Sequence, residues 1–299
     1  MILSWRFILK VILYKCMNKA KRLFLFAGYD KHGIINDALV MYVNALNKFG
    51  DVIVCMDSDC DKNELNKLNK LTLHAMAVRH GEYDFGSYKR AYNWACENLD
   101  IKKYDFVYLI NDSVYGPLFD LAPYFEKMES GNLDAFGMVK NPHHTSPHIQ
   151  SWFIGMRKSI FMSEWFNNLL QSVRHHDDKG SVTILYEHGF TKHLIENNLS
   201  WDALYSAPGR SIYNQIKKFY KQKMPFIKKL AFSRHYGALG RQLSYILRHT
   251  DASIRDIIMR CATQTYGYEY IHQTLTRNPI KILYRNTKYL IHKLRTDGI

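Results

Sequence analysis

The 299-residue chain has few cysteines and prolines and lacks any long apolar run. Its five cysteines form no CxxC pair, and no histidine or cysteine cluster with zinc-finger spacing follows Cys55 and Cys60. This scattered, odd-numbered set is typical of reduced thiols in a cytoplasmic protein and argues against a disulfide scaffold. No apolar stretch approaches the roughly 20 residues that are needed to span a bilayer. The sequence therefore predicts a globular protein without a membrane-spanning helix.

Acidic residues are scarce in the last third of the chain. Residues 201–299 contain 18 Lys and Arg but only 5 Asp and Glu, whereas the first 200 residues contain 23 and 22. The net charge of +14 therefore comes almost entirely from one region. A basic region of this kind predicts an anionic partner, such as nucleic acid, an acidic membrane surface or a phosphorylated substrate. The nearly neutral first 200 residues argue against a protein that coats nucleic acid with its whole surface.

The first 20 residues combine apolar and basic side chains at helical spacing. No small-residue cleavage site follows Met1–Tyr14, which argues against a signal peptide. The pattern fits an interfacial helix on a membrane, and it equally fits a short helix packed on the body. The apolar face consists of Trp5, Ile8, Leu9, Ile12 and Leu13, with Lys10, Lys15 and Lys19 nearby.

Strand-like apolar runs alternate with helical repeats through the first 200 residues. This order predicts βαβ units and an α/β fold with a Rossmann-like, mostly parallel sheet. From residue 206 onward, amphipathic basic helices follow one another, with Pro208 and Gly209 at the boundary. We therefore divide the chain into an N-terminal helix (1–20), an α/β domain (21–205) and a basic helical region (206–299). The expected strands are 23–27, 52–56, 75–78, 106–110, 135–139 and 149–156, and the main expected helices are 35–46, 65–71, 86–99, 121–128, 159–173 and 181–197.

Polar residues follow the predicted strands at the points where these strands end. The carboxyl ends of parallel strands meet at one edge of a sheet, where ligands of such folds bind. The sequence therefore predicts a ligand site at that edge. The polar groups are Tyr29-Asp30, Asp57-Ser58-Asp59, Arg79-His80 and Asn111-Asp112-Ser113.

Three of these segments could carry chemistry. Asp112, between Asn111 and Ser113, could hold a divalent cation beside a diphosphate, although Asn and Asp are also common in turns. Gly86 and Ser87 start a predicted helix whose free N–H groups favour an anion, but an ordinary helix cap by Asp84 or Ser87 is the better local explanation. Glu187 lies in an apolar helical stretch, where it is either a general base or a surface carboxylate.

Four motifs in order connect these segments: YDFGSYK, NDSVYGP, HIQSWF and YEHGFT. With them, residues 21–204 resemble the rhamnan synthesis protein F family of bacterial polysaccharide glycosyltransferases, whereas the basic C-terminal region is not part of the resemblance. The resemblance implies a GT-A-type domain that transfers a sugar, commonly rhamnose from dTDP-rhamnose, to a growing cell-surface polysaccharide such as an O-antigen, a capsule or a rhamnan.

The resemblance also implies roles for individual residues. Asp112 occupies the place of the acidic DxD motif and becomes a predicted catalytic residue that stabilises the leaving diphosphate, and the predicted ligand of Mg²⁺ or Mn²⁺. Because Asn111 and Ser113 replace the other acids of that motif, metal dependence is open, and Lys89, Arg90 or His148 could neutralise the diphosphate instead. Glu187 becomes the predicted base. The predicted nucleotide-binding residues are Tyr29, Asp30, Asp84, Gly86, Ser87, Lys89, Asn111 and Ser113, and the predicted acceptor-binding residues are His148, Gln150 and Trp152.

Two other functions stay open from the sequence. The basic region could belong to a nucleic-acid-binding module, although its aromatic residues fall on apolar helix faces and no binding motif is present. The single acid at Asp112 would also suit a non-catalytic assembly protein. In the glycosyltransferase hypothesis, the basic region and the N-terminal helix hold the enzyme on the anionic inner face of the cell membrane, next to a glycan or lipid-linked acceptor.

Overall fold

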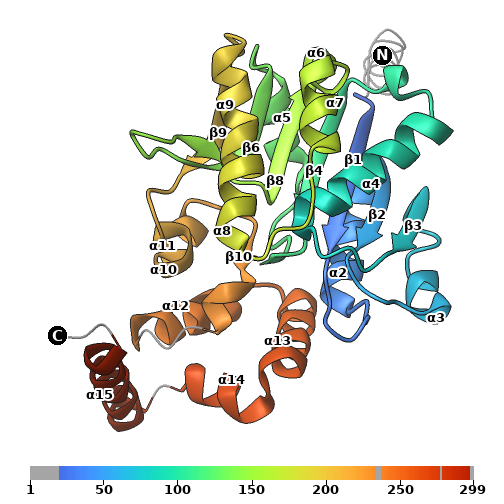
Figure 1. Ribbon diagram of the computed structural model, residues 1–299. Helices are drawn as coiled ribbons and strands as arrows, with labels where there is room; N and C mark the ends of the chain where they lie inside the picture. Colours follow the sequence, from blue (N-terminus) through green and yellow to red (C-terminus); the bar gives the residue numbers. More distant parts are fainter. Residues whose placement is uncertain (1–19, 234–236, 277, 297–299) are drawn as a thin grey trace, which may run out of the picture.

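Three apolar segments form the centre of the sheet in the computed structural model, which describes residues 20–233, 237–276 and 278–296. They are β1 (Arg22–Gly28), β2 (Asp51–Met56) and β4 (Phe106–Asn111), and nearly all of their side chains are buried. Strands of this kind are apolar at every position because helices cover both faces of the sheet (Figure 1).

The sheet is mixed, with the strand order β3-β2-β1-β4-β8-β6-β7 and β9 paired to β6. The strands β1 to β4 are parallel to one another, and β9 is parallel to β6. Only β8 and the short β7 run in the opposite direction, because β8 pairs antiparallel with both β4 and β6. The carboxyl ends of β1, β2, β4, β6 and β9 therefore meet at one edge. The other bounds are β3 His74–Ala77, β6 Ala135–Asn141, β7 His148–Ile149, β8 Phe153–Arg157 and β9 Trp201–Ser206.

Alternating side chains of the central strands feed two core clusters. Leu23 and Leu25 of β1 face α4 (Tyr83–Asn98), α7 (Glu164–Gln171) and α9 (Gly189–Glu196). Phe24 and Phe26 face α2 (Asp37–Asn47) and α5 (Ala122–Glu129) on the other side. The shorter elements are α3 Lys62–Asn66, η1 Ile101–Lys103, α6 Lys158–Phe161, α8 Lys179–Val182 and the π-helical turn η2 Thr183–His188.

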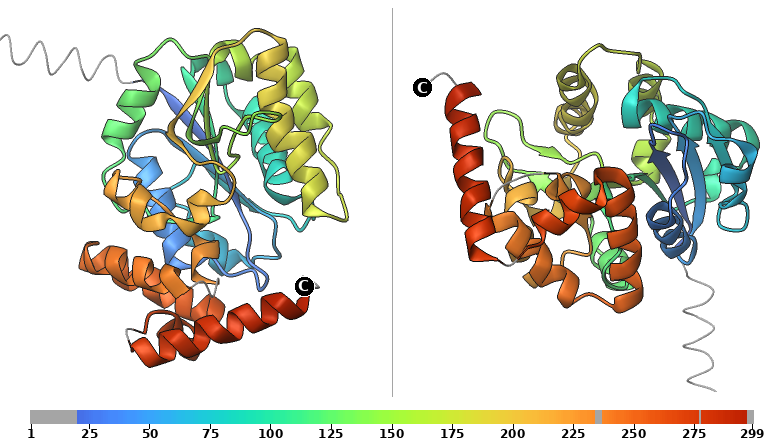
Figure 2. Two further views of the ribbon diagram at one scale, coloured as in Figure 1. Left: turned by 90° about the vertical axis from the view of Figure 1, so that its left-hand side faces the viewer. Right: turned by 90° about the horizontal axis from the view of Figure 1, so that it is seen from below.

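The C-terminal region packs on the end of the body where the strands terminate (Figure 2). A third core cluster joins Ala38 of α2 and Tyr115 of β5 (Val114–Tyr115) to the helices of this region. An ion pair of 2.8 Å between Arg260 and Asp37 lies beside it. The region comprises α10 Ser211–Asn214, α11 Ile216–Lys221, β10 Ile227–Lys228, η3 Lys229–Phe232, α12 Gly237–Arg248, α13 Ala252–Tyr266, α14 Tyr268–Thr274 and α15 Pro279–Thr296.

The predicted α/β class, with its parallel centre and helical C-terminal region, is confirmed. The predicted division at residue 205 coincides with the end of β9, but Ile212, Phe219 and Phe226 beyond it belong to the second core cluster of the body. The predicted helix at residues 1–20 lies almost entirely outside the described residues. Within the described part of the chain, no helix is long and apolar enough to cross a membrane.

Four predicted elements differ from the structure. The helix predicted over 65–71 is displaced, because α3 covers Lys62–Asn66 and a turn follows it. The strand predicted over 149–156 is wrong, because β7 ends at Ile149 and a turn reverses the chain before β8. The hydrogen bonding to β6 continues for one residue beyond β7, since Gln150 N donates to Val139 O at 2.9 Å. The helix predicted over 159–173 is divided at Ser163, whose hydroxyl caps α7 by accepting from Phe166 N. The helix predicted from Gly86 starts at Tyr83, one turn earlier.

Gly155 of β8 is required by close packing between two buried rings. A Cβ at this position would lie 2.3 Å from Phe136 Cε2 and 2.6 Å from Tyr108 Cε1. We expect Gly155→Ala to reduce the free energy of unfolding by about 1–3 kcal/mol, because both rings must move. Urea unfolding measures this loss, and Gly131→Ala is the matched control, since no atom lies within 4 Å of its added Cβ. Equal stability of the two variants would contradict the prediction.

Candidate functional site

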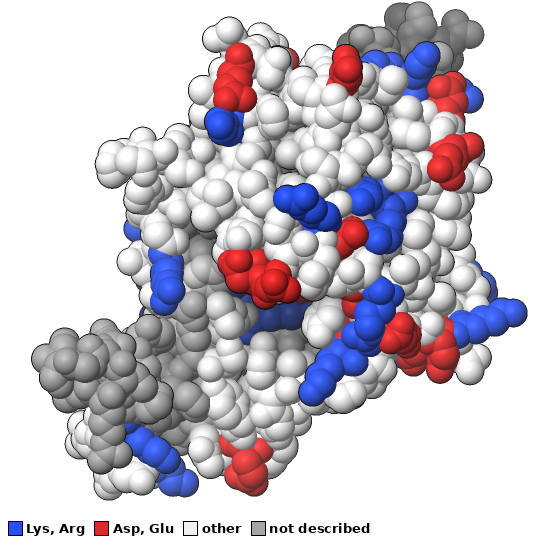
Figure 3. Space-filling view, viewed as in Figure 1, with Lys and Arg blue, Asp and Glu red and all other residues white. Residues whose placement is uncertain are grey.

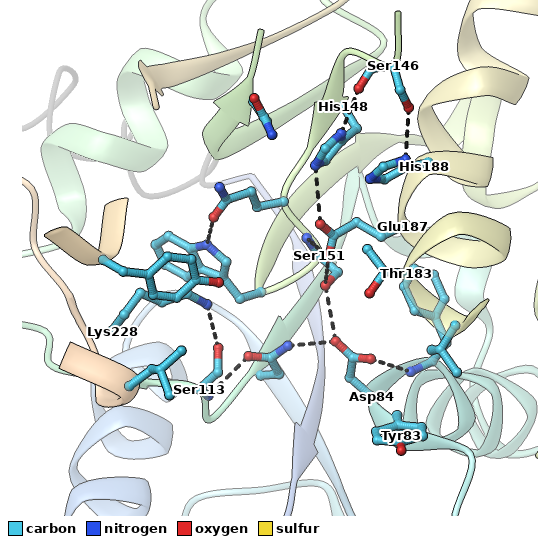
Figure 4. A pocket seen from close by; sticks show the side chains of 18 of the residues that line it. Tyr83, Asp84, Ser113, Ser146, His148, Ser151, Thr183, Glu187, His188 and Lys228 are labelled. Atoms are coloured by element: carbon cyan, nitrogen blue, oxygen red, sulfur yellow. Dashed lines mark hydrogen bonds and ion pairs between the residues drawn. The ribbon is translucent and has the colours of Figure 1, made fainter. Parts of the chain in front are cut away.

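A cavity of about 610 Å³ lies at the sheet edge where the carboxyl ends of the parallel strands meet. Asn111 and Ser113 reach it from the end of β4, and Asp84 from the first turn of α4. The turn between β7 and β8 supplies Ser151, and the π-helical turn η2 supplies Glu187. Figure 4 shows these side chains converging on one space. The structure thus brings together residues from all four motifs of the sequence.

Asp84 is fixed on one wall of the cavity by hydrogen bonds. Its Oδ2 accepts from Asn111 Nδ2 at 2.9 Å, and its Oδ1 accepts from Phe85 N at 3.2 Å. Tyr83, directly before it, has a φ of 59°, which is a strained conformation for a bulky side chain. This backbone turns the start of α4 toward the cavity and presents the Asp84 carboxylate to it.

Ser151 joins Asp84 to Glu187. Its Oγ lies 3.1 Å from Asp84 Oδ2 and is also hydrogen bonded to Glu187 Oε2, which accepts from Ser151 N at 3.2 Å as well. A hydroxyl has a single proton, so Ser151 Oγ donates to one carboxylate at a time and lies beside the other. Ser151 therefore holds the two carboxylate groups next to each other on the same wall of the cavity.

His148 contacts the other oxygen of Glu187. Its Nδ1 donates to Ser146 O at 2.9 Å, which leaves Nε2 facing Glu187 Oε1 at 3.4 Å. His188 stacks on His148 with ring centroids 3.9 Å apart, and its Nδ1 lies 2.8 Å from Ser146 Oγ. Burial, together with the charges of His148 and His143, lowers the pKa of His188. The His188 imidazole is therefore neutral at physiological pH.

Two lysines form the opposite wall, and the sequence prediction missed both. The pairing of β10 with β5 places Lys228 opposite Val114, and Lys228 Nζ donates to Ser113 Oγ at 2.8 Å. Lys228 Nζ also lies 5.0 Å from the centre of the Trp152 ring. Lys229 lines the cavity beside it. Figure 3 shows basic side chains within the hollow between the sheet body and the C-terminal helices.

Asp112 does not fit the divalent-cation site that its position suggests. Its Oδ2 forms an ion pair with Lys229 Nζ at 2.9 Å, so an ammonium group already occupies the place of the cation. Neither flanking residue supplies a second carboxylate, because Asn111 Oδ1 accepts from Ser113 N at 3.1 Å within the same turn. A Mg²⁺ or Mn²⁺ ion prefers several oxygen ligands, and here it would have to displace Lys229 first.

A different group in the described part of the chain has ligand atoms close enough for a metal ion. The ligand atoms of His148, Glu187 and His188 lie within 4.8 Å of one another. The two imidazole planes differ by only 25°, however. Lone pairs in nearly parallel rings point in similar directions rather than at a shared point, so the rings would have to turn before both could bind one ion. The group fits a metal only after this rearrangement.

The remaining predicted residues lie in two places. Gln150 and Trp152 line the cavity with His148, and Trp152 Nε1 donates to Gln150 Oε1 at 2.9 Å. Five predicted nucleotide-binding residues do not belong to the cavity lining. They are Tyr29, Asp30, Gly86, Ser87 and Lys89.

Structural contacts occupy four of these five residues. Asp30 Oδ1 accepts from His32 N and Ile34 N and shapes the loop after β1. The amide of Gly86 bonds Glu82 O within α4, so the free amides predicted at this position are wrong. Ser87 Oγ is 3.0 Å from His80 Nε2. Lys89 Nζ donates to Val173 O at 2.7 Å and lies 3.8 Å from Glu82, which also pairs with Arg90 at 2.6 Å.

Tyr29, the fifth residue, is 57% exposed at the same sheet edge. Its role in nucleotide binding stays a prediction.

The family model described as rhamnan synthesis protein F matches residues 52–292. The match therefore extends through most of the basic region, and the expectation that this region lies outside the resemblance is wrong. No curated protein sequence matches the chain.

Solved structures with similar folds include three at low identity. Core-mannan synthase A of Aspergillus fumigatus, in an Mn/GDP form, is 13% identical with a TM-score of 0.34, over 62% of this chain and 72% of its own. The mannosyltransferase Ktr4p of S. cerevisiae is 10% identical with a TM-score of 0.34, over 51% and 60%. A cytidylyltransferase of Leptospira borgpetersenii is 13% identical with a TM-score of 0.35, over 64% and 76%.

Proposed function

The chain belongs to the rhamnan synthesis protein F family, and on that premise we propose that it is a GT-A-type glycosyltransferase of polysaccharide biosynthesis. It transfers a sugar from a nucleotide diphospho-sugar to a hydroxyl of a growing glycan. The donor that the family suggests is dTDP-rhamnose, and the acceptor is a glycan or a lipid-linked precursor of a cell-surface polysaccharide. The cavity at the carboxyl edge of the sheet binds both substrates.

The observation that carries this proposal is the chain of contacts from Asp84 through Ser151 and Glu187 to His148. An acceptor hydroxyl attacks an anomeric carbon faster when a base removes its proton, and a positioned base contributes about 10²- to 10⁴-fold in rate. Glu187 is that base in our proposal. Ser151 fixes one of its oxygens and His148 the other, so its orientation is set before substrate arrives. Gln150 and Trp152, in the same turn, contact the acceptor.

A thermal-shift experiment with a panel of nucleotide sugars tests the proposed function. We expect at least one nucleotide diphospho-sugar to raise the unfolding temperature of the full chain, since a ligand that binds only the folded state stabilises it. Mannitol and an unmodified nucleoside serve as controls for non-specific effects. If no donor stabilises the protein, with or without Mn²⁺, the glycosyltransferase proposal fails.

We also propose that α15 holds the enzyme on an anionic membrane surface. Four large apolar residues of this helix are exposed and share one face by their spacing: Ile280, Leu283, Tyr284 and Ile291. Lys281 and Lys288 flank that face. A helix with an exposed apolar face bordered by lysines suits the interface of anionic lipids. A location at the inner face of the cell membrane, near a lipid-linked acceptor, follows from this proposal.

The double variant Lys281→Gln/Lys288→Gln is expected to bind anionic vesicles about 30-fold more weakly, because each lysine near such a surface contributes about 1 kcal/mol. Sedimentation with phosphatidylglycerol vesicles measures the change, and vesicles of phosphatidylcholine alone give the baseline. Lys62→Gln/Lys70→Gln is the matched control, since both lysines are exposed on the body away from α15. If both double variants lose the same affinity for the vesicles, binding depends only on the net charge of the protein and the proposed role of α15 is wrong.

A further inference from the structure

The cavity is electrostatically divided. Asp84 and Glu187 lie on one wall and Lys228 on the other, with Ser113 between them (Figure 4). Lys229 lines the cavity next to Lys228, and Asn111 Nδ2 donates to Asp84 Oδ2. A nucleotide diphospho-sugar has a matching division, because its diphosphate carries negative charge and its anomeric carbon needs a base nearby. Only one orientation of such a ligand places the diphosphate beside the ammonium groups and the sugar beside Glu187.

Lys228 is built into the wall rather than exposed on a surface. The residue is 8% exposed, and Ile227 before it is buried, as are Ala231 and Phe232 of η3. The pairing of Ile227 with Tyr115 and of Lys228 with Val114 fixes its backbone against the turn that follows β4. The rings of Trp152 and Tyr213 lie 5.0 and 5.9 Å from its Nζ. An ammonium group that is shielded from solvent binds an anion more strongly than one that is exposed to water.

Lys229 places a second positive charge on the same wall. Its backbone N donates to Ser113 O at 2.9 Å, so the two consecutive lysines are both anchored to the turn that contains Asp112. Its Nζ pairs with Asp112 Oδ2 and lies 5.5 Å from the centre of the Tyr115 ring. A diphosphate oxygen could share this ammonium with Asp112, because an ammonium has three donor hydrogens.

We infer that Lys228 and Lys229 bind the diphosphate of the donor and supply, without a divalent cation, the positive charge that stabilises the leaving nucleoside diphosphate. This inference rests on the proposed function and names the ligand chemistry of one wall of its site. In the transfer step, the acceptor oxygen forms a bond to the anomeric carbon while the bond from that carbon to the diphosphate oxygen breaks. The electron pair of the broken bond stays on the diphosphate beside the two ammonium groups, and Glu187 takes the acceptor proton.

Asp112 has a different role in this arrangement from the one that its sequence position suggests. It positions Lys229 and binds no metal. Asp112→Asn separates the two possibilities, because it removes a metal ligand but leaves both lysines in the wall. We expect this variant to keep the metal-free binding of a nucleoside diphosphate, because the Lys229 backbone stays bonded to Ser113 O and Asp112 no longer competes with phosphate for the ammonium. The loss of a metal ligand would instead make metal-dependent binding much weaker.

The test is calorimetric titration of the full chain with dTDP, UDP and GDP in the presence of EDTA. We expect binding of at least one of them without metal, and about 10- to 100-fold weaker binding by Lys228→Met and Lys229→Met, since each variant loses a charge-assisted hydrogen bond to phosphate. Lys228→Arg should retain part of the affinity. Lys221→Met is the matched control, because Lys221 is exposed on α11 outside the cavity lining. Circular dichroism confirms that each variant is folded.

The outcomes separate this inference from the proposed function. Wild-type affinity in Lys228→Met and Lys229→Met, or strict dependence of binding on Mn²⁺ or Mg²⁺, would overturn the lysine site and leave the glycosyltransferase proposal intact. The absence of any binding of nucleoside diphosphates or nucleotide sugars by the wild type, with metal or without it, would instead overturn the proposed function itself.

Discussion

Glu187→Gln is expected to reduce the rate of glycosyl transfer by about 10²- to 10⁴-fold, because a glutamine amide cannot take the acceptor proton. Glutamine has nearly the same shape, and its carbonyl oxygen can still accept from Ser151 N, which now bonds Glu187 Oε2 at 3.2 Å. Donor affinity should therefore change little, since Lys228 and Lys229 on the opposite wall are untouched. Single-turnover rates and calorimetric binding of the same protein measure the two quantities separately.

Asp84→Asn is the matched comparison for Glu187→Gln. Asp84 shares the Ser151 hydroxyl with Glu187 and is the other carboxylate of the same wall. If Asp84→Asn abolishes transfer while Glu187→Gln leaves it near the wild-type rate, the base is Asp84 and our assignment is wrong. If both variants lose transfer strongly, the two acids act as one proton-holding unit, and the double variant should then be little worse than either single variant.

Arg22→Met is expected to reduce the free energy of unfolding by about 3–5 kcal/mol, because it leaves a buried carboxylate without its cation. Arg22 of β1 donates to both oxygens of Glu129, at 2.6 and 2.5 Å, and both side chains are nearly inaccessible to water. Tyr108 OH also donates to Glu129 Oε1 at 2.6 Å. The pair therefore ties the central strands to the end of α5.

Urea unfolding of Arg22→Met and of the double variant Arg22→Met/Glu129→Gln tests this account. The glutamine removes the charge but can still accept from Tyr108 OH, so the double variant should regain part of the lost stability. If Arg22→Met loses less than about 1 kcal/mol, the pair behaves like an exposed one and is not desolvated.

The central strands could be predicted from sequence because burial on both faces leaves a continuous apolar run. Phe106–Asn111 is the clearest case, and the polar residues at its end do reach the cavity. Glu187 could be predicted because it is an acid inside an apolar helical stretch, and the structure places it in the cavity within a π-helical turn. Turns of this kind frequently occur at functional sites.

The rest of the site depends on contacts that no local pattern encodes. Ser151 meets Glu187 only because the chain turns between β7 and β8, where the sequence predicts one strand over 149–156. Lys228 reaches Ser113 across 115 residues through a two-residue strand. The basic composition of the C-terminal region indicated an anionic partner, but it does not distinguish two buried lysines from many exposed ones.

The start of α4 shows a related limit. Gly86 and Ser87 have the composition of a helix start, and they predicted an anion site there. The helix instead begins at Tyr83 with a positive φ, which local propensity disfavours and tertiary packing enforces. Asp84 consequently moves into the first turn and faces the cavity, while Lys89 points to Val173 on the side of α7. The anion site predicted at Gly86 and Ser87 depends on the incorrect helix start, whereas the role of Lys89 toward a nucleotide comes from the family resemblance.

Transfer itself is the most direct test of the central claim. The full chain is incubated with dTDP-rhamnose in EDTA and with a short rhamnan oligosaccharide, and the acceptor mass and the released dTDP are measured together. We predict that the acceptor gains one rhamnose for each dTDP released, and that Glu187→Gln abolishes both signals. If neither product forms from dTDP-rhamnose or from any other nucleotide sugar, with or without Mn²⁺, the account is contradicted.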